Sequence, residues 1–446
     1  MTVIEQFAAF STSVQPPPEA IHAAKRCLLD WFGAGIAGST AAPATMLRHA
    51  FPGSGASRLL ADGVTRDART AALINGAASH IVEVDDIYRS GLYHPGVVTI
   101  PAALALAEAQ SASGTDLLNA IIAGYEVSNR IARAVNPAHY QHWHTTGTVG
   151  HFGATVAAAR LLNLDAARTA HAMATVATFA AGLRHAFSSD AMSKPLHAGR
   201  AAEGGVAAAL MARADVTGVL DMLEGVRGFG VSMSADVDWQ SAVSTLGSEW
   251  TIIDTTPKAH ACCGHNFAAL DAIGILMQEH GIQAEEIAGI EIATYRAAVE
   301  ICGNANPQTA PEGRFSLPYC ASVMAHVGHV TPQAFMDTDM LRKDYRDLAS
   351  RITLAVDPGA EAKFPHARSA TVSLCLKDGQ TLTHHRPTRK GDPDDPLSDA
   401  DLRAKYRQLA EPVLGDTRAE ALANAVMSID TIINVRELPI GQVQLT

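Results

Sequence analysis

Residues 197–212 read HAGRAAEGGVAAALMA, a stretch that consists mostly of alanine and glycine. Its apolar positions recur at helical spacing, which indicates a helix rather than a strand. The small side chains allow neighbouring helices to approach closely. We therefore predict that this segment is a helix inside a tightly packed helical domain.

Similar patterns precede this segment along the chain. They lie at 18–36, 68–84, 97–110, 115–134, 147–162 and 166–184. The first of them begins with Pro18, a residue that is favoured at the start of a helix. An alternating strand pattern of any length does not occur before about residue 250. These observations predict that residues 1–252 form an all-helical domain.

The pattern changes after residue 253. Strands are predicted at 287–295, 351–358, 371–377 and 380–385, and helices at 265–280 and 332–349. Asp378-Gly379 separates the last two strands and is a strong signal for a tight hairpin. Residues 253–392 are therefore predicted to form a smaller α+β domain.

The last part of the chain is predicted to be helical again. Ser398 is a suitable N-cap for a helix that we expect to end near Leu409, before Pro412, and a second helix is expected at 417–429. We expect residues 393–446 to return to the helical domain. The predicted fold class is mainly α, with a large all-helical domain and a smaller α+β lid domain.

Composition limits the classes of function. A chain of 446 residues is longer than one core usually supports, so two domains are expected. The net charge of −11 argues against nucleic acid as the main partner. No apolar run approaches the roughly 18 residues of a membrane span, and the first residues lack a signal-peptide pattern. With six cysteines and no C-x-x-C pair, we expect a cytoplasmic protein without a membrane partner.

The densest polar segment is Glu83-Val-Asp-Asp-Ile-Tyr-Arg-Ser-Gly-Leu-Tyr-His94-Pro-Gly96. It gathers carboxylates, an arginine, tyrosines and a histidine in a chain of which only 18% is charged. Burying a carboxylate is costly unless it is paired, neutralised or used. The segment reads as the floor of a polar pocket, with a solvated loop as the alternative.

A second polar segment is Ser193-Lys194-Pro195-Leu-His197, followed by the small-residue helix. A residue before proline is biased toward extended backbone, so we expect Lys194 to precede the helix. Its ammonium and the helix N-terminus could then hold a carboxylate together. The alternative is a surface lysine at a helix cap.

Three further segments carry groups suited to chemistry. His144 opens the helix predicted at 147–162 and is seven residues before His151, although histidines satisfied in a core are the commoner outcome. Cys262, Cys263 and His265 suggest zinc, but adjacent cysteines point apart and the spacing fits no usual finger, so we predict no metal. Tyr319 is a possible phenol donor, with simple packing as the alternative.

Other enzyme classes lack their signatures in this sequence. Residues 225–230 contain a glycine-rich pattern, but it follows a predicted helix and not a strand, so the dinucleotide interpretation is weak. Neither a G-x-S-x-G motif nor a P-loop occurs. A serine hydrolase or an NTPase is therefore not expected.

Taken in order, the polar segments resemble the MmgE/PrpD family, which includes 2-methylcitrate dehydratase, cis-aconitate decarboxylase and iminodisuccinate epimerase. The resemblance covers nearly the whole chain. Its motifs are the acidic segment ending in His94-Pro95-Gly96, His144-Thr145-x-Gly147, Lys194-Pro195-Leu196-His197-x-Gly199, Lys258, and Phe315-Ser316-Leu317-Pro318-Tyr319.

The resemblance implies a helical domain and an α+β lid, with the active site between them and a homodimer as the usual assembly. It also implies that neither a metal nor an organic cofactor is needed. The pocket residues that it marks are Asp85, His94, His144, Lys194, Lys258 and Tyr319. This chain departs from the family pattern at Ile87, where a threonine is usual, and at Cys263, where the decarboxylase branch has a histidine.

The family's substrates are small polycarboxylates whose reaction begins at a carbon acid beside a carboxylate. Cations must stabilise the charge that develops, and Lys194, Lys258 and Arg89 could supply them. The base is expected to be His94 or His144, with Asp85 fixing an imidazole tautomer. Further substrate contacts are expected from Asp86, His197 and His265.

Residue types alone do not separate the possible outcomes of such a reaction. Return of the proton to the opposite face gives an epimer, whereas loss of a β-hydroxyl gives an alkene. Because the acidic motif departs from the dehydratase pattern at Ile87, we expect epimerisation of an iminodisuccinate-like substrate, with a citrate-type dehydratase as the alternative. A non-enzymatic helical binding protein is the second alternative.

Overall fold

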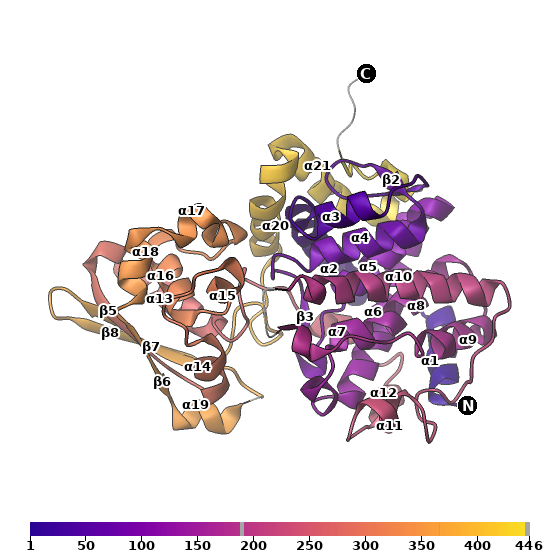
Figure 1. The fold of residues 1–446 in the computed structure, drawn as a ribbon, viewed down its shortest axis with the longest axis horizontal. Coiled ribbons are helices and arrows are strands. Elements are labelled where there is room, and N and C mark those ends of the chain that lie inside the picture. The colour runs from indigo at the N-terminus through magenta and orange to yellow at the C-terminus, as the bar shows by residue number, and fades with distance from the viewer. Residues whose placement is uncertain (188–190, 365, 442–446) are drawn as a thin grey trace. The chain divides into compact units, whose positions relative to one another are not determined.

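The computed structural model describes residues 1–187, 191–364 and 366–441 (Figure 1). The chain divides into two compact units, which are Met1–Pro257 with Ser398–Thr446, and Lys258–Leu397. Helices make up 59% of the structure and strands 9%. The predicted mainly helical fold, with a smaller mixed domain, is thus confirmed.

The first unit is built from helices of very different lengths (Figure 1). They are α1 (Val3–Ser13), α2 (Pro18–Ser39), α3 (Ala44–Ala50), α4 (Ala68–Ser79), α5 (Gly96–Gln110), α6 (Gly114–Val135), α7 (Thr145–Thr148), α8 (Gly150–Leu161), α9 (Ala166–Val176), α10 (Ser193–Arg213), α11 (Phe229–Met233), α12 (Trp239–Ser244), α20 (Asp399–Leu414) and α21 (Asp416–Met427). Its strands are β1 (Ser57–Arg58), β2 (Thr65–Arg66), β3 (Ile87–Tyr88) and β4 (Thr255–Thr256). Four helices, α5, α6, α8 and α10, contribute many of the buried apolar side chains.

Helix α10 contains the alanine- and glycine-rich segment 197–212, and it packs against α4 and α8. A Cβ atom on Gly199 would lie 2.3 Å from the carbonyl oxygen of Leu73 in α4. A Cβ atom on Gly205 would lie 2.4 Å from the Cβ of Ala154 in α8. Glycine at these two positions therefore permits the close helix packing that the composition predicts.

Several helix ends differ from the sequence-based expectation. The helix predicted at 68–84 ends at Ser79, because the polar side chains that follow hydrogen-bond in an irregular segment instead of continuing the helix. The helix predicted at 166–184 ends at Val176, and 147–162 is divided into α7 and α8.

Two predictions that relied on proline were wrong. Lys194 lies in the first turn of α10 and not in an extended residue before it, since a first turn tolerates Pro195 without losing a helical hydrogen bond. Helix α20 continues through Pro412 to Leu414, where Gly415 N–H donates to Glu411 O. Pro412 removes one backbone hydrogen bond from the helix, and the bond from Gly415 to Glu411 still closes the last turn.

The second unit contains a four-stranded sheet with the strand order β6-β5-β7-β8 (Figure 1). The strands are β5 (Ile287–Thr294), β6 (Ile352–Val356), β7 (Ala370–Leu376) and β8 (Thr381–Arg386). Strand β5 is parallel to β6 and antiparallel to β7, and β7 is antiparallel to β8. Gly379 has a φ of 92° in the predicted hairpin, a conformation that favours glycine.

Helix α13 (Phe267–His280) packs on β7 and β8 of this sheet and on α16 (Leu317–Val327). The remaining helices of the unit are α14 (Arg296–Cys302), α15 (Ala310–Arg314), α17 (Asp337–Met340), α18 (Lys343–Ala349) and α19 (Pro358–Lys363). The single helix predicted at 332–349 is thus divided into a 3₁₀ turn at Pro332–Phe335, α17 and α18. Among all described helices, none combines the length and apolar character that a membrane span requires.

Candidate active site

The acidic segment between α4 and α5 is buried in the first unit. Glu83, Asp85 and Asp86 all have buried side chains. This burial excludes the solvated-loop alternative of the sequence analysis. Their partners therefore decide what the segment can do.

Asp85 connects two histidines. Its Oδ2 atom lies 2.8 Å from Nδ1 of His80 and 2.9 Å from Nδ1 of His94. His94 Nδ1 also lies 2.8 Å from the backbone oxygen of Asp86. Since a carboxylate and a carbonyl only accept, both imidazoles donate through Nδ1, and their Nε2 atoms carry the lone pair.

His80 is the residue that the sequence analysis missed. It caps the C-terminal end of α4 and is fully buried. Its only signal in the sequence is its place five residues before Asp85, directly ahead of the acidic segment. Burial lowers the pKa of His80 despite the neighbouring Asp85 carboxylate.

Two more histidines extend this group. The ring of His144 stacks on His80 with 5.5 Å between ring centroids, and its Nδ1 lies 3.1 Å from Nδ1 of His197. Burial is the main cause that lowers the pKa of His144 and of His197, and nearby cationic groups lower both further. We call His80, His94, His144 and His197, together with Asp85, the histidine cluster.

Different elements position these rings. His144 is the N-cap residue of α7, and its N–H donates to Gly182 O at 2.8 Å. His197 lies in α10, and His94 lies just before α5. His94 and His144 are the two residues that the sequence predicts as the base. His94 is the more exposed of them, with 17% of its side chain accessible, whereas the residue His144 is 2% exposed.

Lys194 supplies the positive charge beside these histidines. Its ammonium forms an ion pair with Glu83 and lies 5.5 Å from the ring centroid of Phe187. That phenyl ring also packs edge-on against His144, with 4.8 Å between centroids. The sequence-predicted residues Asp85, His94, His144, Lys194 and His197 are thus brought together in one unit.

Asp86 was predicted to contact substrate, but both of its carboxyl oxygens are engaged inside the helical unit. Tyr125 Oη donates to Oδ2 at 2.7 Å, and Gly96 N–H donates to Oδ1 at 3.0 Å. Burial, and then the nearby Asp30 carboxylate, raise the pKa of Asp86 to about 7. These contacts favour a role in positioning His94 over direct contact with substrate.

Of the other predicted residues, Arg89 belongs to the first unit, and Lys258, His265 and Tyr319 belong to the second. Lys258 is the first residue of the second unit and is buried, and Arg89 begins a partly exposed 3₁₀ turn. Tyr319 Oη donates to Ala334 O at 2.5 Å, which is the packing role that the sequence analysis left open. His265 Nδ1 lies 2.7 Å from Tyr295 Oη, and burial lowers the pKa of His265 to about 3.

Among the described residues, one group offers ligands for a metal ion. His80, Asp85 and His94 each place one ligand atom within 4.8 Å of the others. The same Nδ1 atoms of both histidines donate to Asp85, so a cation bound there would replace these protons. The absence of a metal requirement stays a prediction.

Two family models match the chain, and the second of them covers the second unit together with helices α20 and α21 of the first. Residues 3–242 match the model of the MmgE/PrpD N-terminal domain, and residues 260–431 match that of the MmgE/PrpD C-terminal domain. The relatives include the cis-aconitate decarboxylase-like protein oryM of Aspergillus oryzae, which is 25% identical over 98% of this chain and 96% of its own length. Cis-aconitate decarboxylase of Homo sapiens is 28% identical, over 92% of this chain and 88% of its own length.

A further relative is cis-aconitate decarboxylase of Aspergillus terreus, which is 24% identical over 95% of this chain and 91% of its own length. The relatives thus align with this chain over nearly its full length. Because the two family models together cover most of the sequence, the chain belongs to the MmgE/PrpD family.

Proposed function

We propose that the protein is a lyase that acts on a small polycarboxylate, and that its specific reaction is the decarboxylation of a cis-aconitate-like substrate. The relatives carry decarboxylase names, which supports the lyase alternative over the epimerisation that the sequence analysis favoured. Among the contacts of the histidine cluster that the described residues make, none favours an epimerase over a lyase.

The observation that carries the proposal is the paired support of His94 by Asp85 and by the Asp86 carbonyl. Two acceptors on Nδ1 fix the ring and its tautomer, and they stabilise the imidazolium that forms when Nε2 takes up a proton. His94 can therefore hold a proton at Nε2 and deliver it to carbon. The neutral His80 and His144 beside it add no competing positive charge.

Lys194 is proposed to hold a substrate carboxylate. An ammonium on a flexible stem binds carboxylates readily, and in this structure it binds that of Glu83. A substrate carboxylate would take over part of that interaction. In the transition state, negative charge leaves the carboxylate that departs as CO₂ and spreads through the conjugated system onto a carboxylate that remains, so a fixed ammonium beside the retained carboxylate lowers the barrier.

The proposed step balances without a cofactor. The bond between a carboxylate and the carbon skeleton breaks and CO₂ leaves, while the electron pair remains in the conjugated system. The proton at Nε2 of His94 then forms the new C–H bond. A tricarboxylate and one proton thus give an unsaturated dicarboxylate and CO₂. Lys258 is retained as a second proposed cation, and no step is routed through Tyr319.

The test is incubation of the purified protein with cis-aconitate, with CO₂ measured by release and the organic product identified by NMR. His94→Gln should abolish CO₂ release, while His49→Gln, a change of an exposed histidine in α3, should leave it intact. Hydration of cis-aconitate without release of CO₂ would show that the protein catalyses the dehydratase reaction and not decarboxylation. No reaction of cis-aconitate, together with interconversion of the enantiomers of separately supplied iminodisuccinate, would overturn the lyase proposal.

A further inference from the structure

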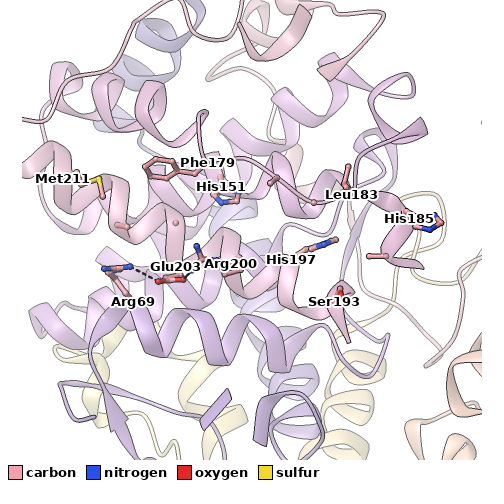
Figure 2. A pocket seen from close by; sticks show the side chains of 15 residues that line it. Arg69, His151, Phe179, Leu183, His185, Ser193, His197, Arg200, Glu203 and Met211 are labelled. Atoms are coloured by element: carbon pink, nitrogen blue, oxygen red, sulfur yellow. Dashed lines mark hydrogen bonds and ion pairs between the residues drawn. The ribbon is translucent and has the colours of Figure 1, made fainter. Parts of the chain in front are cut away.

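One cavity of the first unit adjoins the histidine cluster. It has a volume of about 780 Å³ and lies between α10 and residues 179–186 (Figure 2). His197, a member of the histidine cluster, lines this cavity and also contacts His144, so the cavity meets the cluster at this imidazole. The volume is within the usual range of small-molecule sites.

One part of the cavity wall is apolar. Phe179, Leu183 and Met211 line it, and they are 40%, 60% and 39% exposed. Alanine residues 181, 186 and 207 add further apolar surface. Large apolar side chains gathered around one hollow commonly mark a binding site, because an apolar ligand removes their surface from water.

The other part carries charge. Glu203 forms ion pairs with Arg69, at 2.8 Å, and with Arg200 (Figure 2). Two guanidinium groups against one carboxylate leave one positive charge at the wall. His151 also lines the cavity, but burial lowers its pKa to about 4, so it is neutral near pH 7. A ligand with one negative charge would complete this charge balance.

We propose that the cavity binds a small carboxylic acid with an apolar chain. The chain would lie against Phe179, Leu183 and Met211, and the carboxylate beside Arg69 and Arg200. An arginine binds a carboxylate through two parallel hydrogen bonds, which favours an acid over an alcohol of the same length. Binding rests on the geometry of this cavity alone and not on the proposed reaction.

The contact between His197 and His144 couples a ligand in the cavity to the other rings of the histidine cluster. A ligand against His197 restricts that ring, and with it the Nδ1 that lies 3.1 Å from His144. Bound acid should therefore alter turnover, a consequence that rests on the proposed lyase function. The binding itself is measurable without any turnover.

The binding test is isothermal titration calorimetry of the full chain with hexanoate, hexan-1-ol and malonate as probes. Hexanoate should bind about tenfold more tightly than either of the others, because only it has both the chain and the charge. Arg200→Gln should weaken hexanoate binding about tenfold and leave hexan-1-ol unchanged. Arg213→Gln, in the exposed last turn of the same helix, is the matched control and should change neither.

Three results would overturn the proposal. They are no measurable hexanoate binding, equal binding of hexan-1-ol, or an equal loss in Arg200→Gln and Arg213→Gln. Sedimentation velocity adds a fourth, since hexanoate binding to the monomer but not to a dimer would make the cavity an interface between copies. Each variant is compared with the parent by circular dichroism; Arg200 is exposed, so its substitution should not unfold the chain.

Steady-state measurement of CO₂ release from cis-aconitate at increasing hexanoate concentration tests the coupling through His197. Hexanoate should change the kcat or KM of CO₂ release in the parent and in Arg213→Gln, and much less in Arg200→Gln. Unchanged kinetics at saturating hexanoate would overturn this coupling. A chain that binds hexanoate but turns over no cis-aconitate would contradict the lyase and leave the cavity proposal standing.

Discussion

Asp86 is a buried acid whose position makes folding depend on pH. Burial and the Asp30 carboxylate raise its pKa to about 7 in the folded chain, above the value of about 3.9 for an unfolded aspartate. The folded state therefore binds the proton more tightly, and stability from this group falls as pH rises from about 4 to about 7. Full ionisation costs on the order of 2–4 kcal/mol.

Asp86→Asn removes this ionisation while keeping the shape of the side chain. The free energy of unfolding, measured with urea at pH 5 and pH 8, should fall less for the variant than for the parent. Lowered pKa values of His80, His144 and His197 act in the opposite direction in both proteins, so the difference between them isolates Asp86. An identical pH dependence would show that Asp86 is ionised throughout.

Lys194 should matter for turnover and little for folding. Its ammonium is close to Glu83 and to the histidine cluster, but it is partly exposed, with 19% of the side chain accessible. Lys194→Ala should lower kcat/KM by about a hundredfold or more, because a fixed charge beside the retained carboxylate, on which negative charge develops, is lost. Lys343→Ala, an exposed lysine of α18, is the matched control. Near-parental turnover in folded Lys194→Ala would refute the role.

For single residues, the sequence indicates the type of chemistry better than it indicates which side chains contact one another. The residue types around His94 and Lys194 point to acid–base work on a carboxylate, and the structure brings those residues together. The sequence could not indicate that His80 belongs to the site, because its ring stacks on His144 from a distant segment. Nor could it indicate that the hydroxyl of Tyr319 is engaged by Ala334 O, since both depend on tertiary packing.

Helix α20 holds the acidic segment in place from the far end of the chain. Lys405 Nζ lies 2.5 Å from Oδ1 of Asp30 in α2 and 2.7 Å from Val84 O, next to Asp85. The Asp30 carboxylate is almost fully buried. A buried carboxylate that loses its partner is strongly destabilising.

Lys405→Met should therefore lower the free energy of unfolding by about 3–5 kcal/mol. The double variant Asp30→Asn/Lys405→Met should regain much of this loss, because no unpaired charge is left. Urea denaturation of the parent, both single variants and the double variant measures the coupling. Additive effects of the two substitutions would show that the pair does not act as a unit.

Among the elements, small-residue periodicity was a reliable guide to helices, and the hairpin at Gly379 was evident from its turn residues. Helix ends were harder to predict. The helix predicted at 332–349 is divided in the structure, and α20 continues through Pro412, because local hydrogen bonding decides where a helix stops. Periodicity records which face is buried, and it carries little information on where a helix ends.

For the whole molecule, the helical unit is assembled from two distant parts of the chain. Residues 398–446 belong to the same unit as residues 1–257, and α20 packs along α2. Leu402, Tyr406 and Leu409 of α20 are buried in that core. Each buried side chain of this size contributes about 1.5–3 kcal/mol, so their sum is comparable with the whole stability of a domain.

A chain that ends at Leu397 should therefore fail to form a stable helical unit, although it keeps every residue of the histidine cluster. Its thermal unfolding transition should be lost or much lowered, and cis-aconitate turnover with it. Co-expression of residues 398–441 as a separate chain should restore both, because the contacts between α2 and α20 need no covalent link. A truncated chain with a parental melting temperature would show that the N-terminal helices form a complete core without α20.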